Sequence, residues 1–138
     1  MILFATDGSS YSKLAGETVS NLLEAFPNAK LLVMYVIKPF YAGVDFGGFP
    51  QVVEDYETQI TRRIEDEIMQ TFERFPGRVT FRHIYGDPVF VICEAAEKHH
   101  ADLIVIGSHG RGALDRLLLG SVSSGVVQRS TTTVMVVK

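Results

Sequence analysis

Near-continuous apolar runs alternate with amphipathic segments along this chain, and that alternation restricts the fold more than any other feature. In Lys30–Ile37 every residue after the lysine is hydrophobic. A strand without polar alternation is covered on both faces, as in a parallel sheet with helices on each side. Met1–Thr6, Asp102–Ile106 and Thr132–Val137 are similar, and Arg78–Tyr85 alternates as a strand near an edge does. We therefore predict five strands alternating with four helices in a Rossmann-like, three-layer α/β/α fold around a parallel sheet.

The four amphipathic segments predict helices, because their apolar positions recur at steps of three and four residues. The longest, Gln51–Phe75, carries mixed charges on its other faces, which is typical of a solvated surface. Gly86-Asp87-Pro88 caps the third helix and places proline at its first position. The residues expected to face inward are Ala15, Val19, Leu22, Leu23 and Phe26 in the first helix; Val53, Tyr56, Ile60, Ile64, Ile68, Phe72 and Phe75 in the second; Ile92, Cys93 and Ala96 in the third; and Val122, Val126 and Val127 in the fourth, Val122–Arg129.

A glycine-rich loop, Gly107–Ser121, separates the fourth predicted strand from the last helix. Glycine lets a backbone approach an anion closely and adopt positive φ, and a helix N-terminus offers unpaired N–H groups. Ser121 is the expected N-cap of that helix. The loop lacks the lysine of a Walker A sequence and the G-x-G-x-x-G spacing of the dinucleotide fingerprint. It is therefore a phosphate cradle of another kind, or a group of glycines that only makes a tight turn.

The spacing of this loop is G-x-x-G followed, after nine residues, by G-S, at Gly107, Gly110, Gly120 and Ser121. It resembles the signature of the universal stress protein family in its ATP-binding branch. The likeness covers nearly the whole chain, through Ala5–Ser9, Gly86–Pro88, Ala101–Ser108 and Val134–Val137. The resemblance implies the strand order 3-2-1-4-5. In that order the first and fourth strands are neighbours at the switch point, where ligands bind at the carboxyl ends of strands, so Asp7 would lie beside Gly107.

The resemblance also implies a site for ATP, with or without Mg²⁺ or Mn²⁺. The phosphates would rest on backbone N–H groups of the glycine loop and of the last helix, the ribose near Asp7 and Gly107, and the adenine against the end of the second strand, read through its backbone. The candidate nucleotide-binding residues are Thr6, Asp7, Val36, Ile37, Gly107, His109, Gly110, Arg111, Gly120, Ser121 and Val122.

Three of these side chains leave alternatives open. Asp7 would accept a hydrogen bond from the nucleotide or hold a divalent ion, or it only forms a turn and caps the first helix. Arg111, like Arg116, would neutralise phosphate charge or is an ordinary surface residue. His109 is the titratable, nucleophile-like residue of the cradle, but a general base also needs a positioned water and an orienting partner, which the sequence does not reveal.

The resemblance and the predicted site together imply that the protein is a nucleotide-dependent regulator or sensor of the stress response. It would be at most a slow ATPase, and whether it is an enzyme stays open. One alternative is an ATP pyrophosphatase or adenylyl-transfer enzyme on a similar fold, but Asp7-Gly8-Ser9-Ser10 lacks the Ser-Gly-Gly-x-Asp-Ser pattern of that relative. The other is a nucleotide-free dimeric interaction protein, as in the family branch without the glycine loop, and the intact loop argues against it.

Composition limits the partners and the compartment. The chain has 138 residues, of which 46% are hydrophobic and 21% are charged, and we expect residues 1–138 to form a single domain. No apolar run approaches the ~20 residues of a membrane span. A net charge of −3 argues against a nucleic-acid partner. The single cysteine, Cys93, excludes an internal disulfide and suits a reducing cytoplasm, with Cys93 more consistent with a core residue than a reactive thiol. His99-His100 fits a helix C-terminus better than a metal site.

Two segments point to surfaces beyond the nucleotide site. Lys38–Pro50 is a long irregular segment with the aromatic residues Phe40, Tyr41, Phe46 and Phe49; it either packs on its own domain or forms a lid or a surface for an unknown protein partner. Thr133–Val137 is an apolar strand at the sheet edge, and only Lys138 follows it. Because an uncovered edge strand invites pairing, we expect a homodimer in which the two last strands lie antiparallel.

Overall fold

The order of strands along the sheet is the one that the resemblance implied. The computed structural model describes residues 1–38, 50–110 and 119–138. Its sheet has the order β3-β2-β1-β4-β5, and every neighbouring pair is parallel. The elements are β1 (Ile2–Thr6), α1 (Ser10–Ala25), β2 (Leu31–Ile37), α2 (Pro50–Thr71), β3 (Val79–Tyr85), α3 (Pro88–Lys98), β4 (Leu103–Gly107), α4 (Ser121–Arg129) and β5 (Thr133–Val137). The predicted α/β fold is confirmed.

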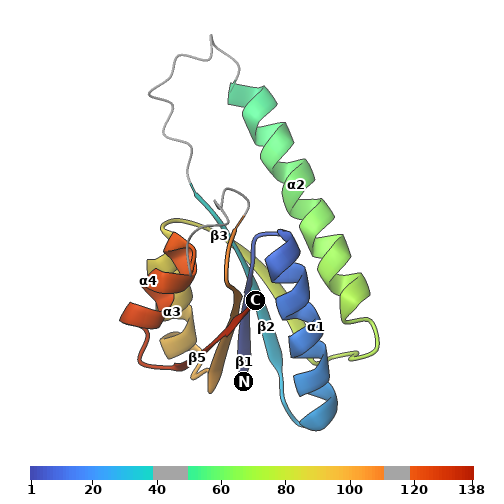
Figure 1. Cartoon of the computed structure of the whole chain (residues 1–138). Helices are drawn as coiled ribbons and strands as arrows, with labels where there is room; N and C mark the ends of the chain where they lie inside the picture. Colours follow the sequence, from blue (N-terminus) through green and yellow to red (C-terminus); the bar gives the residue numbers. More distant parts are fainter. Residues whose placement is uncertain (39–49, 111–118) are drawn as a thin grey trace.

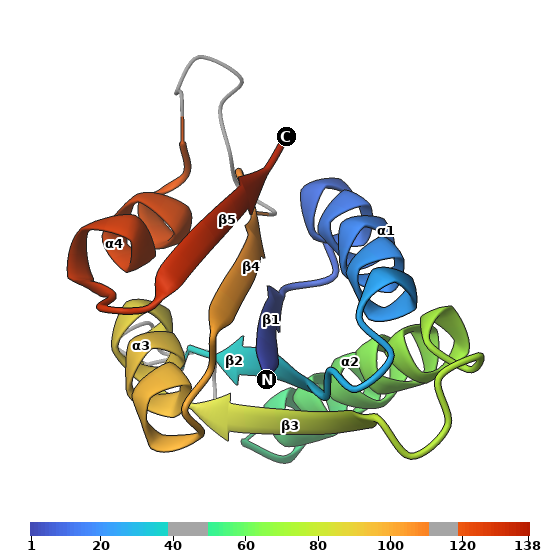
Figure 2. The same cartoon turned by 90° about the horizontal axis from the view of Figure 1, so that it is seen from below.

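Helices cover both faces of the sheet, which explains the continuous apolar runs. Figures 1 and 2 show α1 and α2 on one face and α3 and α4 on the other. Alternate residues of each strand therefore enter two separate cores: Phe4 packs with α1 and α2, and Leu3 packs with α3 and α4. All five residues of β1 are buried. Cys93 is buried in the second core, as predicted, and burial raises the pKa of its thiol.

Three inward positions predicted from helical spacing are wrong. Phe26 is 59% exposed because α1 ends at Ala25 and Phe26 is its C-cap, outside the helical stripe. Tyr56 is 64% exposed because the N-terminal part of α2 projects past the carboxyl ends of the strands (Figure 1), beyond the core residues that the structure describes. Val127 is 46% exposed, and the buried face of the short helix α4 consists of Ser123 and Val126. Val53 and the aromatic residues at 40, 41, 46 and 49 lie outside the residues whose side chains are described.

Arg78 joins two elements in a way that the sequence did not predict. It lies just before β3, and its guanidinium donates hydrogen bonds to three backbone carbonyls at the end of α1: from Nε to Ala29 (2.9 Å), and from Nη2 to Leu23 (3.0 Å) and Phe26 (2.8 Å). The guanidinium carbon also lies over the ring of Phe75, 5.3 Å from its centroid. A cation at the C-terminus of a helix satisfies carbonyls that have no intrahelical donor.

None of the described helices combines the length and the apolar character needed to cross a bilayer.

Candidate functional site

A cavity of about 600 Å³ opens at the carboxyl ends of the strands, on the side of the sheet covered by α3 and α4. It brings together β1 and β4 residues that are about 100 positions apart in the chain, as expected at the switch point. Most of the predicted site residues line it: Thr6, Asp7, Val36, Gly107, His109, Gly110, Gly120, Ser121 and Val122. Ile37 is not among the lining residues, and its carbonyl accepts a hydrogen bond from the N–H of Gly86 (3.0 Å). Arg111 and Arg116 lie outside the described residues.

The floor of the cavity belongs to the core between the sheet and α3. Ala5, Met34 and Ile106 reach it from three neighbouring strands, and Pro88 and Ile92 reach it from α3. Polar groups surround this apolar floor, so the cavity has the composition of a small-molecule site. Several lining residues were not predicted from the sequence, among them Ser12, Tyr35, Lys38 and Ser123. Lys38 could have been found, because it directly follows β2 at the end of the sheet where ligands bind.

The two carboxylate oxygens of Asp7 have different surroundings. Oδ1 accepts a hydrogen bond from the N–H of Ser9 (3.0 Å), which forms the turn into α1. Oδ2 lies beside the glycine loop, since a Cβ placed on Gly110 would be 2.8 Å from it. Ser9, rather than Asp7, is the N-cap of α1. A side chain at position 110 would displace this carboxylate, so glycine there leaves Asp7 in its place beside the loop.

Hydroxyl groups beneath Asp7 fix the turn between β1 and α1. The Thr6 hydroxyl accepts from the N–H of Gly8 (3.2 Å) and donates to the Ser12 hydroxyl (3.2 Å), which in turn donates to the carbonyl of Ser9 (2.9 Å). Both hydroxyls are therefore engaged within the turn. The cavity wall formed by Thr6 and Ser12 is held in one geometry before any ligand binds.

The glycines of the loop serve different purposes. A Cβ on Gly107 would lie 2.7 Å from the carbonyl carbon of Tyr11 and 2.8 Å from the nitrogen of Ser12, so this glycine allows α1 to approach the end of β4. Gly120 has φ −69°, so it does not use the positive φ that glycine permits. A Cβ on Gly120 would lie 3.2 Å from the carbonyl oxygen of Ser108 and 3.3 Å from Cα of His109. Gly120 is thus required for space, not for a left-handed conformation.

The start of α4 differs from the prediction. The N-cap is Gly120, Ser121 is the first helical residue, and no side chain caps the helix. The other two helices with described caps use Ser9 and Asp87 for this purpose. The predicted cap was displaced because Gly120 already has the extended backbone of an N-cap residue, with ψ 164°. First-turn N–H groups of a helix have no intrahelical acceptor, so α4 presents donors and its positive dipole end at the cavity.

Ser108 holds the start of α4 against β4. Its carbonyl accepts hydrogen bonds from the N–H of Gly120 (2.7 Å) and from the hydroxyl of Ser123 (2.7 Å), and Ser108 is fully buried. Ser123 also donates to the carbonyl of Gly120 (3.0 Å). This double attachment positions the N-terminus of α4 at the cavity even though residues 111–118 are not described.

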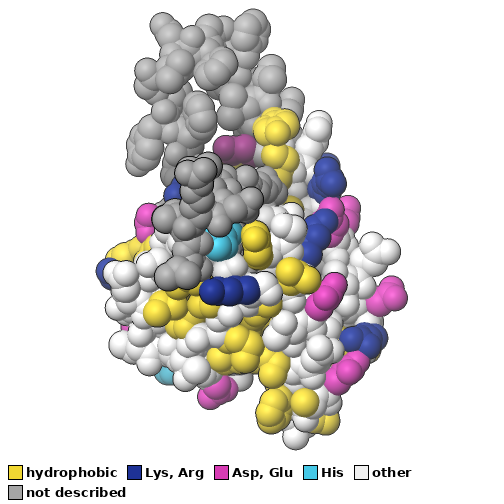
Figure 3. All heavy atoms as spheres, in the orientation of Figure 1, with side chains coloured by type: hydrophobic (Ala, Val, Ile, Leu, Met, Phe, Trp, Pro, Cys, Tyr) yellow, Lys and Arg dark blue, Asp and Glu magenta, His cyan; other side chains and the backbone are white. Residues whose placement is uncertain are grey.

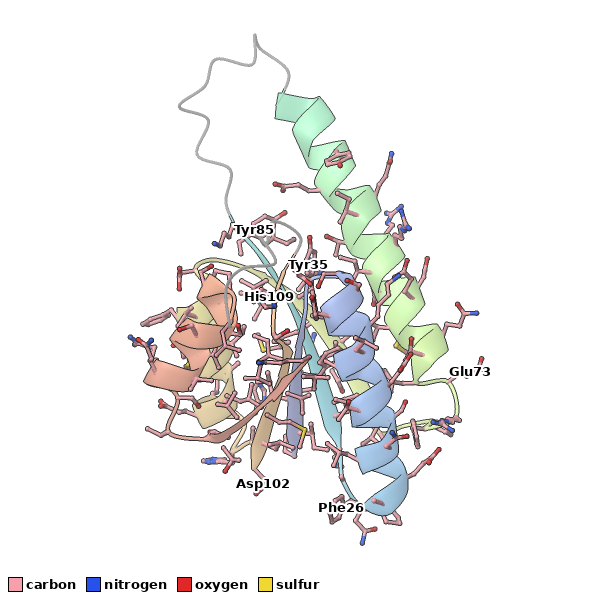
Figure 4. All side chains as sticks on the ribbon, viewed as in Figure 1. Phe26, Tyr35, Glu73, Tyr85, Asp102 and His109 are labelled. Atoms are coloured by element: carbon pink, nitrogen blue, oxygen red, sulfur yellow. The ribbon has the colours of Figure 1, made fainter. Side chains whose placement is uncertain are left out.

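His109 forms part of the cavity wall. Its Nδ1 lies 3.0 Å from the hydroxyl of Ser108, its carbonyl accepts from the Ser9 hydroxyl (3.3 Å), and its ring lies 5.1 Å from the ring of Tyr11. Figure 4 shows His109 near Tyr35 at the carboxyl end of the sheet, far from Phe26 and Asp102 at the other end. The orienting groups that the sequence did not reveal are therefore Ser108 and Tyr11.

Metal ligands are not clustered in the described part of the chain. In residues 1–38, 50–110 and 119–138, no group of three or more His, Cys, Asp or Glu side chains could hold a metal ion. Asp7 is the carboxylate that lines the cavity.

Comparisons with known proteins agree with this geometry. The sequence model of the universal stress protein family matches residues 1–138. Universal stress protein MJ0531 of Methanocaldococcus jannaschii is 31% identical, over 99% of this chain and 81% of the relative. The solved structure of protein MJ0577, from the same organism, has a TM-score of 0.86 and 28% identity, over 99% of this chain and 94% of that chain.

A nucleotide is present in another solved relative. A universal stress protein in complex with cAMP has a TM-score of 0.68 and 28% identity, over 99% of this chain and 94% of that chain. Because the family model covers the whole chain and MJ0531 is similar over nearly all of it, the protein belongs to the universal stress protein family.

Proposed function

We propose that this protein binds ATP and acts as a nucleotide-dependent regulator or sensor in the stress response. The observation that carries the proposal is the position of the N-terminus of α4. It has no side-chain cap, and it lies at a cavity of about 600 Å³ at the switch point of the sheet. An uncapped helix start favours an anion, and an apolar floor favours a flat base. The cAMP bound to a related structure supports an adenine nucleotide.

Each part of the nucleotide has a matching part of the cavity in this proposal. The phosphates would accept hydrogen bonds from the N–H groups of Ser121 and Val122 and lie against Gly110 and Gly120, which line the cavity without side chains. The ribose would lie beside Asp7 and Gly107. The adenine would lie over Met34, Val36, Pro88 and Ile92, and Arg111 remains a proposed phosphate contact outside the described residues.

A divalent ion would enter with the nucleotide. Since the described residues contain no ready-made metal cluster, Mg²⁺ or Mn²⁺ would be held chiefly by phosphate oxygens and water, with Asp7 as the protein carboxylate within the cavity. The ion would neutralise phosphate charge.

The experiment that tests the proposal identifies the nucleotide directly. Mass spectrometry of small molecules released from the purified, denatured protein is expected to detect adenine nucleotides. Titration calorimetry should then show ATP binding more tightly than ADP or AMP, because more donors meet the longer phosphate chain, with GTP as the control for the base. A protein that releases no nucleotide and gives no heat with ATP would contradict the proposal.

Hydrolysis is proposed to be slow at most. His109 lines the cavity and its Nδ1 lies 3.0 Å from the Ser108 hydroxyl, which orients the ring, but a general base also needs a positioned water, and Asp7 is the carboxylate among the described lining residues. We therefore propose that the protein binds and holds the nucleotide. We also propose that residues 1–138 form one domain. The cytoplasmic location stays a prediction from the cysteine content.

Replacing Asp7 with alanine is expected to lower ATP affinity about tenfold, since a hydrogen bond to a charged group is lost. The hydrogen bond from the N–H of Ser9 in the turn is lost as well, so stability should fall by ~1 kcal/mol. Asp7→Asn is the matched control: it retains an acceptor for Ser9 but not the charge, so its stability should be near that of the parent while its affinity is reduced. Calorimetry and thermal unfolding measure both. A loss of stability with unchanged affinity would make Asp7 purely structural.

We further propose a homodimer through β5. In the described residues no strand pairs with the outer edge of β5, and Figure 3 shows hydrophobic side chains gathered over this strand; Met135 is 36% exposed. The carbonyl of Val137 accepts from the N–H of Ser108 (2.7 Å), so Val137 points its backbone toward β4. Because backbone groups alternate in direction along a strand, Val136 directs its N–H to the free edge. An antiparallel partner strand would satisfy that edge.

Val136→Pro should shift the protein from dimer to monomer. Proline removes the N–H at the free edge without removing a hydrogen bond to β4. Val136→Ala retains the N–H and is the control, which should remain dimeric. Sedimentation velocity measures the change, and circular dichroism checks that the proline variant is folded. A parent protein that sediments as a monomer at micromolar concentration would refute the proposal.

A further inference from the structure

Gly125, in the middle of α4, has a contact that explains why it is glycine. A Cβ placed on Gly125 would lie 2.6 Å from Cγ2 and 3.2 Å from Cγ1 of Val89, the second residue of α3. Glycine inside a helix is unfavourable relative to alanine, and no positive φ requires glycine at this position. The close approach of the two helices is therefore the physical reason for Gly125. Val89 cannot easily turn away, because β-branched side chains have one strongly preferred rotamer in a helix.

This contact lies close to both walls of the cavity, one helical turn along α4 and one residue along α3. Gly125 follows Ser121 by four residues, and Val89 directly follows Pro88; Ser121 and Pro88 line the cavity, whereas Gly125 and Val89 do not. Figure 2 shows α3 and α4 side by side on the same face of the sheet. Another described contact between them is the guanidinium of Arg129 over the ring of Phe90, 4.9 Å from its centroid. A long arginine side chain tolerates small shifts, so the contact between Gly125 and Val89 is the more rigid of these two, and Val126 of α4 packs in the same core as Ile92 of α3.

We infer that Gly125 and Val89 are positioning residues that set the distance between the start of α3 and the start of α4, and thereby the fit of ATP in the cavity. The inference rests on the proposed function. ATP would span the cavity from the apolar surface at Pro88 to the first turn of α4. Moving α4 away from α3 separates the group that holds the base from the groups that hold the phosphates. Adenosine, which lacks the phosphates, depends less on that distance.

The test is a mutant cycle in the full chain, with ATP and adenosine as the probes. Gly125→Ala should lower ATP affinity about tenfold, because overpacking a close helix contact displaces backbone. The loss for adenosine should be smaller, and a variant that is merely less stable would not change the ratio of the two affinities. In Gly125→Ala/Val89→Ala both methyl groups nearest the new side chain are gone, and the remaining Val89 Cβ is at 3.5 Å, an ordinary contact. The double variant should therefore bind ATP as Val89→Ala alone does.

Gly16→Ala is the matched control. Gly16 also lies inside a helix, but the nearest atom to its Cβ would be Cε1 of Phe4 at 3.6 Å, so alanine is accommodated there. This variant should have unchanged ATP affinity and a melting temperature at or above that of the parent. A folded Gly125→Ala variant with parental ATP affinity, or a double variant that does not recover, would overturn the inference.

Two further outcomes keep the test decisive. If Gly125→Ala does not fold, the double variant must fold and bind ATP with the affinity of Val89→Ala, otherwise the inference is wrong. If the parent protein itself does not bind ATP, the proposed function has failed, and this result is distinct from a parent that binds and a variant that is unaffected.

Discussion

Replacing Gly120 with valine is expected to lower ATP affinity at least about 100-fold, about 2.7 kcal/mol of binding free energy. A Cβ at this position already lies 3.2 Å from the Ser108 carbonyl oxygen and 3.3 Å from Cα of His109, so the two methyl groups of valine have no room without moving the start of α4. The proposed phosphate site uses the N–H groups of that first turn. Displacing them, and filling the space beside them, removes both the donors and the cavity.

Gly120→Ala is the graded control for this result. Alanine adds only the Cβ, whose neighbours would need to move by a few tenths of an ångström, so its affinity should lie between those of the parent and the valine variant. Titration calorimetry measures the affinity, and far-ultraviolet circular dichroism checks the fold. A folded Gly120→Val protein with parental affinity would show that the phosphates do not lie at the start of α4.

Arg78→Ala is expected to lower the free energy of unfolding by about 3 kcal/mol, because three carbonyls near the end of α1 lose a charged donor. For a domain of this size the melting temperature should fall by about 10 °C. The carbonyls of Leu23 and Ala29 are partly shielded from water, so water replaces the guanidinium only in part. Calorimetric and urea unfolding measure the two quantities. ATP affinity of the folded variant should be unchanged, since Arg78 lies just before the amino end of β3, at the opposite end of the sheet from the cavity.

Arg74 offers a matched control for Arg78. Its guanidinium also lies over the ring of Phe75, at 5.1 Å, and it pairs with Glu24. Both members of that ion pair are about half exposed, so the pair is screened by solvent and Arg74→Ala should change the unfolding free energy by less than about 1 kcal/mol. Equal losses in the two variants would assign the effect to the aromatic contact and not to the carbonyls of α1.

The existence of each strand and helix was predictable because each depends on a pattern within a short segment. Leu31–Ile37 is apolar throughout because it is buried between two helical layers, and Asp87 followed by Pro88 starts α3 wherever that helix packs. The glycine loop could be recognised for a similar reason, since close backbone approach requires glycine itself. The strand order came from the resemblance to a family, because local patterns do not specify which strands are neighbours.

Three-dimensional packing decided the details that give the site its chemistry. Gly120 is an N-cap with φ −69° because Ser108 holds α4 at its first turn, although the local preference for serine at an N-cap favoured Ser121. Val127 is exposed because the buried face of α4 depends on where α3 lies.

Long-range contacts explain the remaining differences. Gly110 is constrained by the carboxylate of Asp7, and Gly125 by Val89, across 103 and 36 positions of the chain by subtraction of their residue numbers. The sequence alone therefore determined which segments form elements and where glycine is needed, because propensity and burial patterns act over a few residues. Only the tertiary structure decided which atom each glycine makes room for, because that atom comes from another element.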